Sequence, residues 1–222
     1  MHYKGAIFDM DGLLLDTEKV CQNAFRDACK HLSLPMLEEV YLGIIGCNAA
    51  GIKAVLCKGY GDSLDYETLR EEWMKRYHRI VYHQAIPVKP GALALLKWLQ
   101  AQSIPIALAT STDKELSKIK LKFSGLFEYF SCFSNGCEVK CGKPSPEIFL
   151  LAASRLNIPA NECLAFEDSS NGVRSAISAG MQVHQVPDLV EPDAQVRALG
   201  QKVSVSLTEV LAFLKEQHAL KK

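Results

Sequence analysis

The sequence lacks an excess of either charge. Its 222 residues include 25 lysines and arginines and 25 aspartates and glutamates. Proteins that bind nucleic acid or an acidic membrane surface through their overall charge carry a basic surplus. The even balance therefore argues against both classes of partner, and we expect no nucleic-acid binding and no membrane binding.

Long hydrophobic runs are also missing. No apolar segment approaches the roughly 18 residues of a membrane-spanning helix, and the first residues lack the basic and then apolar pattern of a secretory leader. Hydrophobic residues still make up 48% of the chain, which is ample for a buried core. We expect a soluble, cytoplasmic protein. The sequence does not define its oligomeric state, and a monomer is compatible with it.

The eight cysteines lack the spacing of a metal site. Most lie among apolar neighbours, as Cys29 and Cys163 do, where a reduced cysteine packs as a small hydrophobic residue. Cys132, Cys137 and Cys141 are closer together, but they contain no CxxC pair and no fourth ligand is obvious. We therefore expect reduced cysteines rather than disulfides or a zinc site.

Internal repeats and low-complexity segments are absent too, so the fold is inferred from hydrophobic periodicity. Apolar runs typical of strands alternate with helical patterns from residue 87 onward. We expect strands at 3–8, 104–110, 129–133, 163–166, 182–186 and 203–205. The alternation predicts an α/β protein with a Rossmann-like parallel sheet covered by helices on both faces.

The segment between the first and second strands has a different character. It shows helical patterns at 17–32, 49–56 and 66–82 and no convincing strand. Pro87, Pro90 and Gly91 mark the point where strand and helix patterns resume. We predict an α/β catalytic core made of residues 1–16 and 87–222, with an inserted all-helical cap domain of residues 17–86.

Two aspartates one residue apart, Asp9 and Asp11, follow the first apolar run. Gly12 ends that strand in a turn, and the two-residue period of a strand places both carboxylates on one side of the chain. Neighbouring carboxylates repel each other and are costly to desolvate, so they need a cation or a shared proton. The pair predicts a hard metal ion beside one carboxylate that can attack and one that can transfer a proton.

Further polar residues follow later strands, at the sheet edge where open parallel sheets bind ligands. They are Thr110, Ser111, Lys143, Glu167 and Asp168. Hydroxyl and N–H groups at a helix start bind phosphate oxygens, a lysine adds a point charge, and carboxylates hold Mg²⁺. Together these residues predict a site for a phosphate and Mg²⁺.

Some of these residues also have structural explanations. Serine and threonine favour the N-cap position of helices, and Thr112 is a candidate cap. Glu167 could be an acid at a helix entry, stabilised by the helix dipole. Lys143 could be a solvated loop lysine, although its neighbours indicate a fixed turn, and the Lys143–Pro144 bond is a candidate cis peptide.

The motifs occur in the order found in a known family. Asp9-Met10-Asp11-Gly12, Thr110, Lys143 and Glu167-Asp168 resemble the four ordered motifs of the haloacid dehalogenase superfamily. The helical insertion resembles the family's cap, and the similarity covers nearly the whole chain. The branch it resembles holds β-phosphoglucomutase and small sugar-phosphate phosphatases.

The resemblance implies a role for each residue. Asp9 would be the nucleophile that forms an aspartyl-phosphate, and Asp11 would be the general acid and base. Mg²⁺ would be held by Asp9, Asp168 and the backbone carbonyl of Asp11, with Glu167 near its waters. The phosphoryl group would be bound by the remaining members of the set, which are Thr110, Ser111 and Lys143.

We expect a Mg²⁺-dependent phosphatase that hydrolyses a small phosphorylated metabolite, such as a sugar or polyol phosphate. A phosphomutase like β-phosphoglucomutase would use the same intermediate, but such mutases carry an arginine shortly after the cap-loop glycine. Here Gly46 is followed by Cys47-Asn48-Ala49. A non-catalytic phosphate-ligand or protein-binding module is a second alternative, against which the intact aspartate pair counts.

The inserted helices are expected to set specificity through residues 43–49 and 73–77. The aromatic residues Trp73, Tyr77 and Tyr82 are expected in the core of this insertion rather than on a binding surface.

Overall fold

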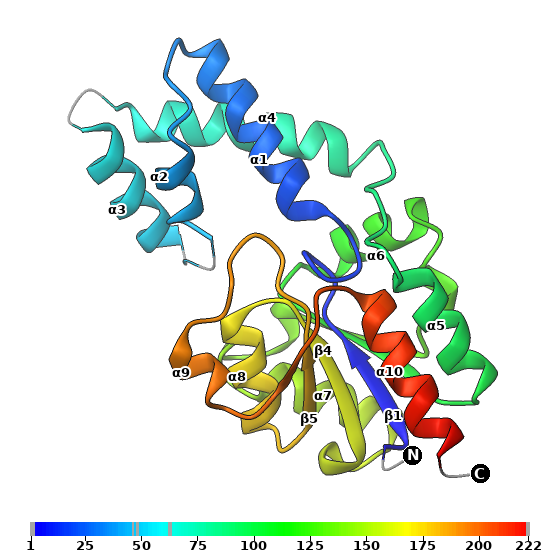
Figure 1. Ribbon diagram of the computed structural model, residues 1–222. Coiled ribbons are helices and arrows are strands. Elements are labelled where there is room, and N and C mark those ends of the chain that lie inside the picture. The colour runs from blue at the N-terminus through cyan, green and yellow to red at the C-terminus, as the bar shows by residue number, and fades with distance from the viewer. Residues whose placement is uncertain (1–2, 46, 48, 62–63, 221–222) are drawn as a thin grey trace.

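The computed structural model describes residues 3–45, 47, 49–61 and 64–220, and it has a parallel sheet with helices on both faces (Figure 1). Six strands form the sheet in the order β3-β2-β1-β4-β5-β6, and every pairing is parallel. The strands are β1 (Gly5–Phe8), β2 (Ile106–Thr110), β3 (Cys132–Asn135), β4 (Cys163–Glu167), β5 (Gln182–Gln185) and β6 (Lys202–Val203). The predicted α/β, Rossmann-like fold is confirmed.

Two hydrophobic clusters cover the two faces of this sheet. Ala6 and Phe8 of β1 face one cluster, and Ile7 between them faces the other, as the alternation of a strand requires. The first cluster includes side chains of α5 (Ala92–Ala101), α6 (Lys114–Phe123) and α10 (Leu207–Ala219). The second includes those of α7 (Glu147–Leu156), α8 (Ser170–Ser178) and α9 (Ala194–Arg197). Burial on both faces explains why the strands are continuous apolar runs.

All six strands differ from the predicted bounds by one or more residues, and for two of them the structure shows the reason. The aromatic run expected as a strand at 129–133 begins as a 3₁₀ turn, Phe127–Tyr129, and the strand covers Cys132–Asn135. Phe127 and Phe130 pack against Phe133, so their apolar character serves packing rather than pairing. The last strand ends at Val203 because Ser206 already caps α10, and Val205 is 87% exposed.

Helices α1 (Thr17–His31), α2 (Glu38–Leu42), α3 (Ala49–Tyr60) and α4 (Tyr66–Val81) form a separate group, here called the helical module. It lies beyond the carboxyl ends of the strands (Figure 1), and it has its own hydrophobic cluster. The Phe25 ring lies 5.0 Å from those of Tyr41 and Trp73 between centroids. The chain enters and leaves the module through adjacent segments, since Asp16 N donates to Pro87 O at 2.9 Å.

The predictions for the module's aromatic residues had different outcomes. Trp73 is buried in the module's cluster, as expected, and its indole donates to Cys21 O at 3.0 Å. The expectation for Tyr82 was wrong, because it lies at the C-cap of α4 and is 40% exposed. The short helix α2 was not predicted. Among the described residues, no helix combines the length and apolar character needed to cross a bilayer.

Candidate active site

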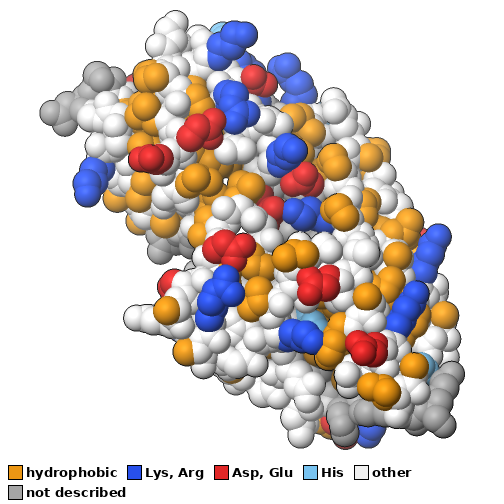
Figure 2. All heavy atoms as spheres, in the orientation of Figure 1, with side chains coloured by type: hydrophobic (Ala, Val, Ile, Leu, Met, Phe, Trp, Pro, Cys, Tyr) orange, Lys and Arg blue, Asp and Glu red, His pale blue; other side chains and the backbone are white. Residues whose placement is uncertain are grey.

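A cavity of about 780 Å³ lies between the carboxyl edge of the sheet and the helical module. In the space-filling view the outline of the molecule is indented between these two parts (Figure 2). The predicted site residues that line the cavity are Asp9, Asp11, Thr110, Ser111, Lys143 and Asp168. Glu167 lies behind them and is fully buried. The shared strand direction places these residues at one edge, as in other open parallel sheets.

Lys143 connects two of the predicted carboxylates. Its Nζ lies 2.5 Å from Asp9 Oδ1 and 2.5 Å from Glu167 Oε1. The other oxygen of Glu167 accepts hydrogen bonds from the backbone N (2.8 Å) and hydroxyl (3.0 Å) of Ser169. The predicted cis bond between Lys143 and Pro144 is confirmed. Burial lowers the pKa of Lys143, but the two carboxylates outweigh it and hold that pKa above its ordinary value.

Three carboxylates form a group that could hold a metal ion. Asp9, Glu167 and Asp168 each offer an oxygen, and these oxygens lie within 4.8 Å of one another. Burial raises the pKa of Asp9 to about 7, with Lys143 opposing and Glu167 adding to the rise. Burial also raises the pKa of Asp168 well above its ordinary value. One lysine therefore leaves this hard-oxygen group short of positive charge, which fits a divalent cation such as Mg²⁺.

Two glycines leave room for these carboxylates. Gly12 has a φ of +83°, and a Cβ there would lie 2.4 Å from Asp168 Oδ2. A Cβ on Gly172, in the first turn of α8, would lie 1.8 Å from Glu167 Oε1. Any larger residue at either position would displace a carboxylate of the group.

The Asp11 carboxylate lies outside this group and has its own partners. Lys120 Nζ donates to Asp11 Oδ1 at 2.8 Å, and the Thr112 hydroxyl donates to Asp11 Oδ2 at 2.6 Å. Lys120 is 2% exposed and also donates to the Tyr77 hydroxyl at 3.0 Å. Burial would raise the pKa of Asp11, but Lys120 and the hydrogen bonds from Lys120 and Thr112 bring it below its ordinary value.

Lys120 was missed in the sequence, although a signal for it exists. It follows Leu116 by four positions and Ser117 by three, so it lies on the buried face of α6. A lysine on the apolar face of a helix needs a buried partner, and here the partner is Asp11. The expected capping role of Thr112 was wrong, because Asp113 caps α6 and accepts from the backbone N of Glu115 and Leu116.

The residues predicted to bind phosphate, Thr110, Ser111 and Lys143, line the same cavity as Asp11. Thr110 is 1% exposed, and its hydroxyl accepts from Thr112 N at 3.1 Å. The backbone of Ser111 passes so close to Gly136 that a Cβ there would lie 2.4 Å from Ser111 O. These contacts fix the segment after β2 in its place at the cavity. Lys143 lines the same cavity.

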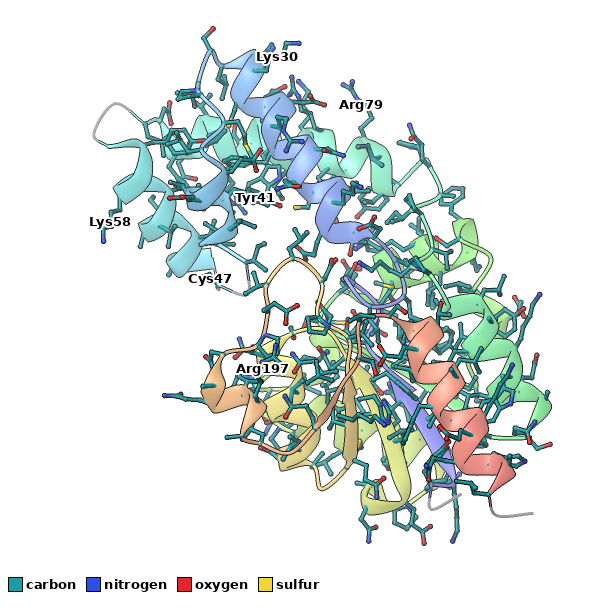
Figure 3. The ribbon with its side chains drawn as sticks, in the orientation of Figure 1. Lys30, Tyr41, Cys47, Lys58, Arg79 and Arg197 are labelled. Atoms are coloured by element: carbon teal, nitrogen blue, oxygen red, sulfur yellow. The ribbon has the colours of Figure 1, made fainter. Side chains whose placement is uncertain are left out.

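The helical module contributes few of the residues expected to set specificity. Ile45 and Cys47 line the cavity, and Cys47 lies at the end of the module that faces the loop after β5 (Figure 3). Gly46 and Asn48, which belong to the expected segment 43–49, lie outside the described residues. Within 73–77, Trp73 is buried in the module and Tyr77 contacts Lys120.

Two acidic residues of the cavity were not predicted. Glu18 lies in the first turn of α1, and Asp188 follows β5. Asp188 Oδ1 accepts from Lys89 Nζ at 2.5 Å. Open parallel sheets bind ligands at the carboxyl ends of their strands, and a search for polar residues after β5 would therefore have found Asp188. Glu18 had no comparable signal, since an acid in a first helical turn is common.

Comparison with known proteins places the chain in a family. The family described as haloacid dehalogenase-like hydrolase matches residues 3–180. A phosphorylated carbohydrates phosphatase of Thermotoga maritima is 32% identical over 218 residues, which are 96% of this chain and 99% of that protein. Hexitol phosphatase A of Escherichia coli is 32% identical over 209 residues, or 90% of this chain and 94% of that protein.

A solved structure of a hydrolase has the same fold as this chain. A HAD family hydrolase from Deinococcus radiodurans, with bound phosphate and sodium, superposes with a TM-score of 0.84 at 25% identity and covers 96% of both chains. The carboxylate group, Lys143 and the aspartate pair lie together at the same sheet edge, as the resemblance implied. The chain belongs to the haloacid dehalogenase-like hydrolases.

Proposed function

We propose that this phosphoric monoester hydrolase is a Mg²⁺-dependent phosphatase that acts on small phosphorylated metabolites, with sugar or polyol phosphates as its substrates, through an aspartyl-phosphate. The observation that carries the proposal is the separation of two kinds of aspartate. Asp9 lies with Lys143 and the other acids of the metal group, whereas Asp11 is held apart by Lys120. Relatives that are phosphatases of phosphorylated carbohydrates and of hexitols support the substrate class.

The first step joins Asp9 to the substrate. A carboxylate oxygen of Asp9 forms a bond to phosphorus, the bond from phosphorus to the leaving oxygen breaks, and that oxygen takes a proton from Asp11. Thr110, Ser111 and Lys143 bind the phosphoryl oxygens. Lys143 is already in contact with Asp9, so it can orient the nucleophile and the phosphoryl group together.

The second step returns Asp9 to its free form. A water molecule forms a bond to phosphorus, Asp11 takes its proton, and the bond between phosphorus and the Asp9 oxygen breaks. The contacts of Asp11 with Lys120 and Thr112 favour its ionised, proton-accepting form. Turning away from Lys120 toward the leaving oxygen would raise the pKa of Asp11 and favour the acid needed in the first step.

The metal proposal assigns Mg²⁺ to Asp9, Asp168 and the backbone carbonyl of Asp11, with Glu167 near its waters. Bound there, Mg²⁺ would neutralise charge on the phosphoryl oxygens. A cytoplasmic location, the absence of nucleic-acid and membrane partners, and the division into a cap of residues 17–86 and a core remain predictions.

The test is phosphate release from a panel of phosphorylated metabolites, with Mg²⁺ and with excess chelator. We expect release that needs Mg²⁺ and that is lost in Asp9→Asn, whose amide cannot form the phosphoenzyme, while the circular dichroism spectrum is unchanged. Mass spectrometry of the wild type quenched during turnover should find the phosphoryl group on Asp9.

Normal turnover by Asp9→Asn would refute the nucleophile. Absence of release from every compound would instead favour the phosphate-ligand or protein-binding module. Glucose 1-phosphate distinguishes a phosphatase from the phosphomutase alternative, since a mutase would convert it to an isomer without releasing phosphate.

A further inference from the structure

The charge of the cavity is unevenly distributed. Its described lining contains five carboxylates and a single lysine, which are Asp9, Asp11, Glu18, Asp168, Asp188 and Lys143. Lys143 is engaged by Asp9 and Glu167 and would also serve the phosphoryl group. Within this lining, no cationic side chain is left for a second anionic group on the substrate.

Two neighbouring lysines do not change this balance. Lys89 is paired with Asp188 at 2.5 Å, and Lys120 with Asp11 at 2.8 Å. The segments that contain the lining residues Ile45, Cys47 and 188–190 add no positive charge either, since neither residues 37–52 nor residues 186–196 contain a lysine or an arginine. A divalent cation would offset the phosphoryl dianion it binds, so the rest of the cavity remains acidic.

Glu18 has unused bonding capacity and belongs neither to the metal group, as Asp168 does, nor to an ion pair, as Asp188 does. In the part of the chain that the structure describes, its carboxylate has neither a hydrogen bond nor an ion pair. Burial, followed by the charges of Asp11 and Asp188, raises the pKa of Glu18 to about 7. A half-buried carboxylate among other acids is stabilised by a hydroxyl donor and destabilised by another anion. Apolar side chains of Ile45 and Leu189 in the same lining fit the C–H surface of a carbohydrate.

We propose that the leaving group of the substrate is uncharged and rich in hydroxyl groups, and that Glu18 selects it by accepting hydrogen bonds from those hydroxyls and repelling carboxylates and second phosphates. This inference rests on the proposed phosphatase function and narrows its substrate class. Polyol, sugar and nucleoside monophosphates are then expected to be substrates, whereas phosphorylated acids and bisphosphates are expected to be poor ones. Glu18 would attract the hydroxyl groups of the first class and repel the second negative charge of the other.

The test compares substrates that differ only in the charge remote from the scissile phosphate. The pairs are glycerol 3-phosphate with 3-phosphoglycerate, glucitol 6-phosphate with 6-phosphogluconate, and fructose 1-phosphate with fructose 1,6-bisphosphate. We expect kcat/KM to favour the uncharged leaving group by about 100-fold or more in at least one pair and to favour the charged one in none. Hydrolysis of p-nitrophenyl phosphate, which has neither hydroxyls nor a second charge, reports separately on the chemistry.

Glu18→Gln tests the residue itself. The amide still accepts a hydrogen bond but no longer repels an anion, so in each pair where the wild type shows the preference, that preference should fall by about tenfold. The matched control is Glu115→Gln, which also lies in the first turn of a helix, with a side chain that is 79% exposed. The control should keep the wild-type preference. Thermal unfolding of both variants shows whether either has lost its fold.

Each outcome decides one part of the inference. Equal or better hydrolysis of the charged partners by the wild type would overturn the uncharged leaving group. An unchanged preference in a folded Glu18→Gln would overturn the role of Glu18. Turnover of p-nitrophenyl phosphate without turnover of any hydroxylated substrate would refute this inference while leaving the phosphatase function standing. Inactivity toward all compounds, p-nitrophenyl phosphate included, would refute both.

Discussion

Lys120 Nζ lies 2.8 Å from Asp11 Oδ1 and 3.0 Å from the Tyr77 hydroxyl. One buried ammonium group therefore joins the aspartate that follows β1 to helix α4 of the helical module. Removing one member of a buried ion pair leaves the other charge uncompensated, which is strongly unfavourable. The contact fixes the position of Asp11 and ties it to the part of the molecule that covers the cavity.

Lys120→Met should impair the enzyme through Asp11. Methionine has similar length but no charge, so Asp11 loses the partner that orients it and favours its ionised form. We expect steady-state turnover of p-nitrophenyl phosphate to fall by about 10- to 100-fold, because the second step needs Asp11 as a base. The first-turnover burst of p-nitrophenolate should persist, since this leaving group departs without a proton. Stopped-flow absorbance measures both.

The control for this experiment is Lys118→Met on the same helix, where the lysine pairs with the exposed Glu115. It should behave as the wild type. Loss of the burst together with turnover in a folded Lys120→Met would show that Lys120 does not act through the second step.

Tyr77→Phe should lower stability without changing the shape of the side chain. The variant removes the hydroxyl that accepts a hydrogen bond from the buried Lys120. The ring itself remains, and in the wild type its centroid lies 5.5 Å from Lys120 Nζ. A hydrogen bond to a charged group contributes about 1.5–3 kcal/mol, so we expect a loss near the lower figure. Urea unfolding measures it, with the exposed Tyr82→Phe as control. Equal stability of the two variants would contradict the prediction.

Gly172→Ala should disturb the carboxylate group from behind. Its Cβ would lie 1.8 Å from Glu167 Oε1, so the buried carboxylate must move away from Lys143. Overpacking of this kind costs about 1–3 kcal/mol of unfolding free energy. Mg²⁺ affinity should weaken as well, and isothermal titration calorimetry would record it.

Gly142→Ala is the matched control, because a Cβ at that position has no heavy atom within 4 Å. It should cost much less stability. If both variants were equally stable and bound Mg²⁺ equally, the close approach of α8 to Glu167 would be wrong.

His184 should make the protein less stable in mild acid. It is 5% exposed, its ring lies between Phe166 and Phe213, and burial followed by the charge of Lys202 lowers its pKa from 6.5 to about 4. Between these two values the unfolded chain binds more protons than the folded one, so unfolding free energy falls as the pH drops. By pH 5 the loss from this residue is about 2 kcal/mol.

The measurement is urea unfolding at pH 7 and pH 5. His184→Gln should lose less stability than the wild type over this interval, by about that amount, whereas the exposed His83→Gln should follow the wild type. An identical decline in the wild type and His184→Gln would show that this imidazole does not stay neutral in the fold.

Much of the site could be predicted because its residues lie next to regular elements. Asp9, Thr110 and Asp168 each come at the end of a strand with a recognisable apolar run, and parallel strands present their carboxyl ends at a common edge. The aromatic run before β3 was misplaced because packing of Phe127 against Phe133 overrode its strand-like pattern. Propensity is a weak guide where a tertiary contact decides the backbone.

The order of apolar runs and helical patterns by itself determined the α/β sheet, the helical insertion and the edge at which the polar residues gather. Only the tertiary structure decided the partner of Asp11, since Lys120 lies 109 positions away, and the membership of Glu18 and Asp188 in the cavity. The reason is that periodicity reports which face of an element is buried. Which side chains meet across elements depends on how helices and loops pack, and that information is spread over the whole chain.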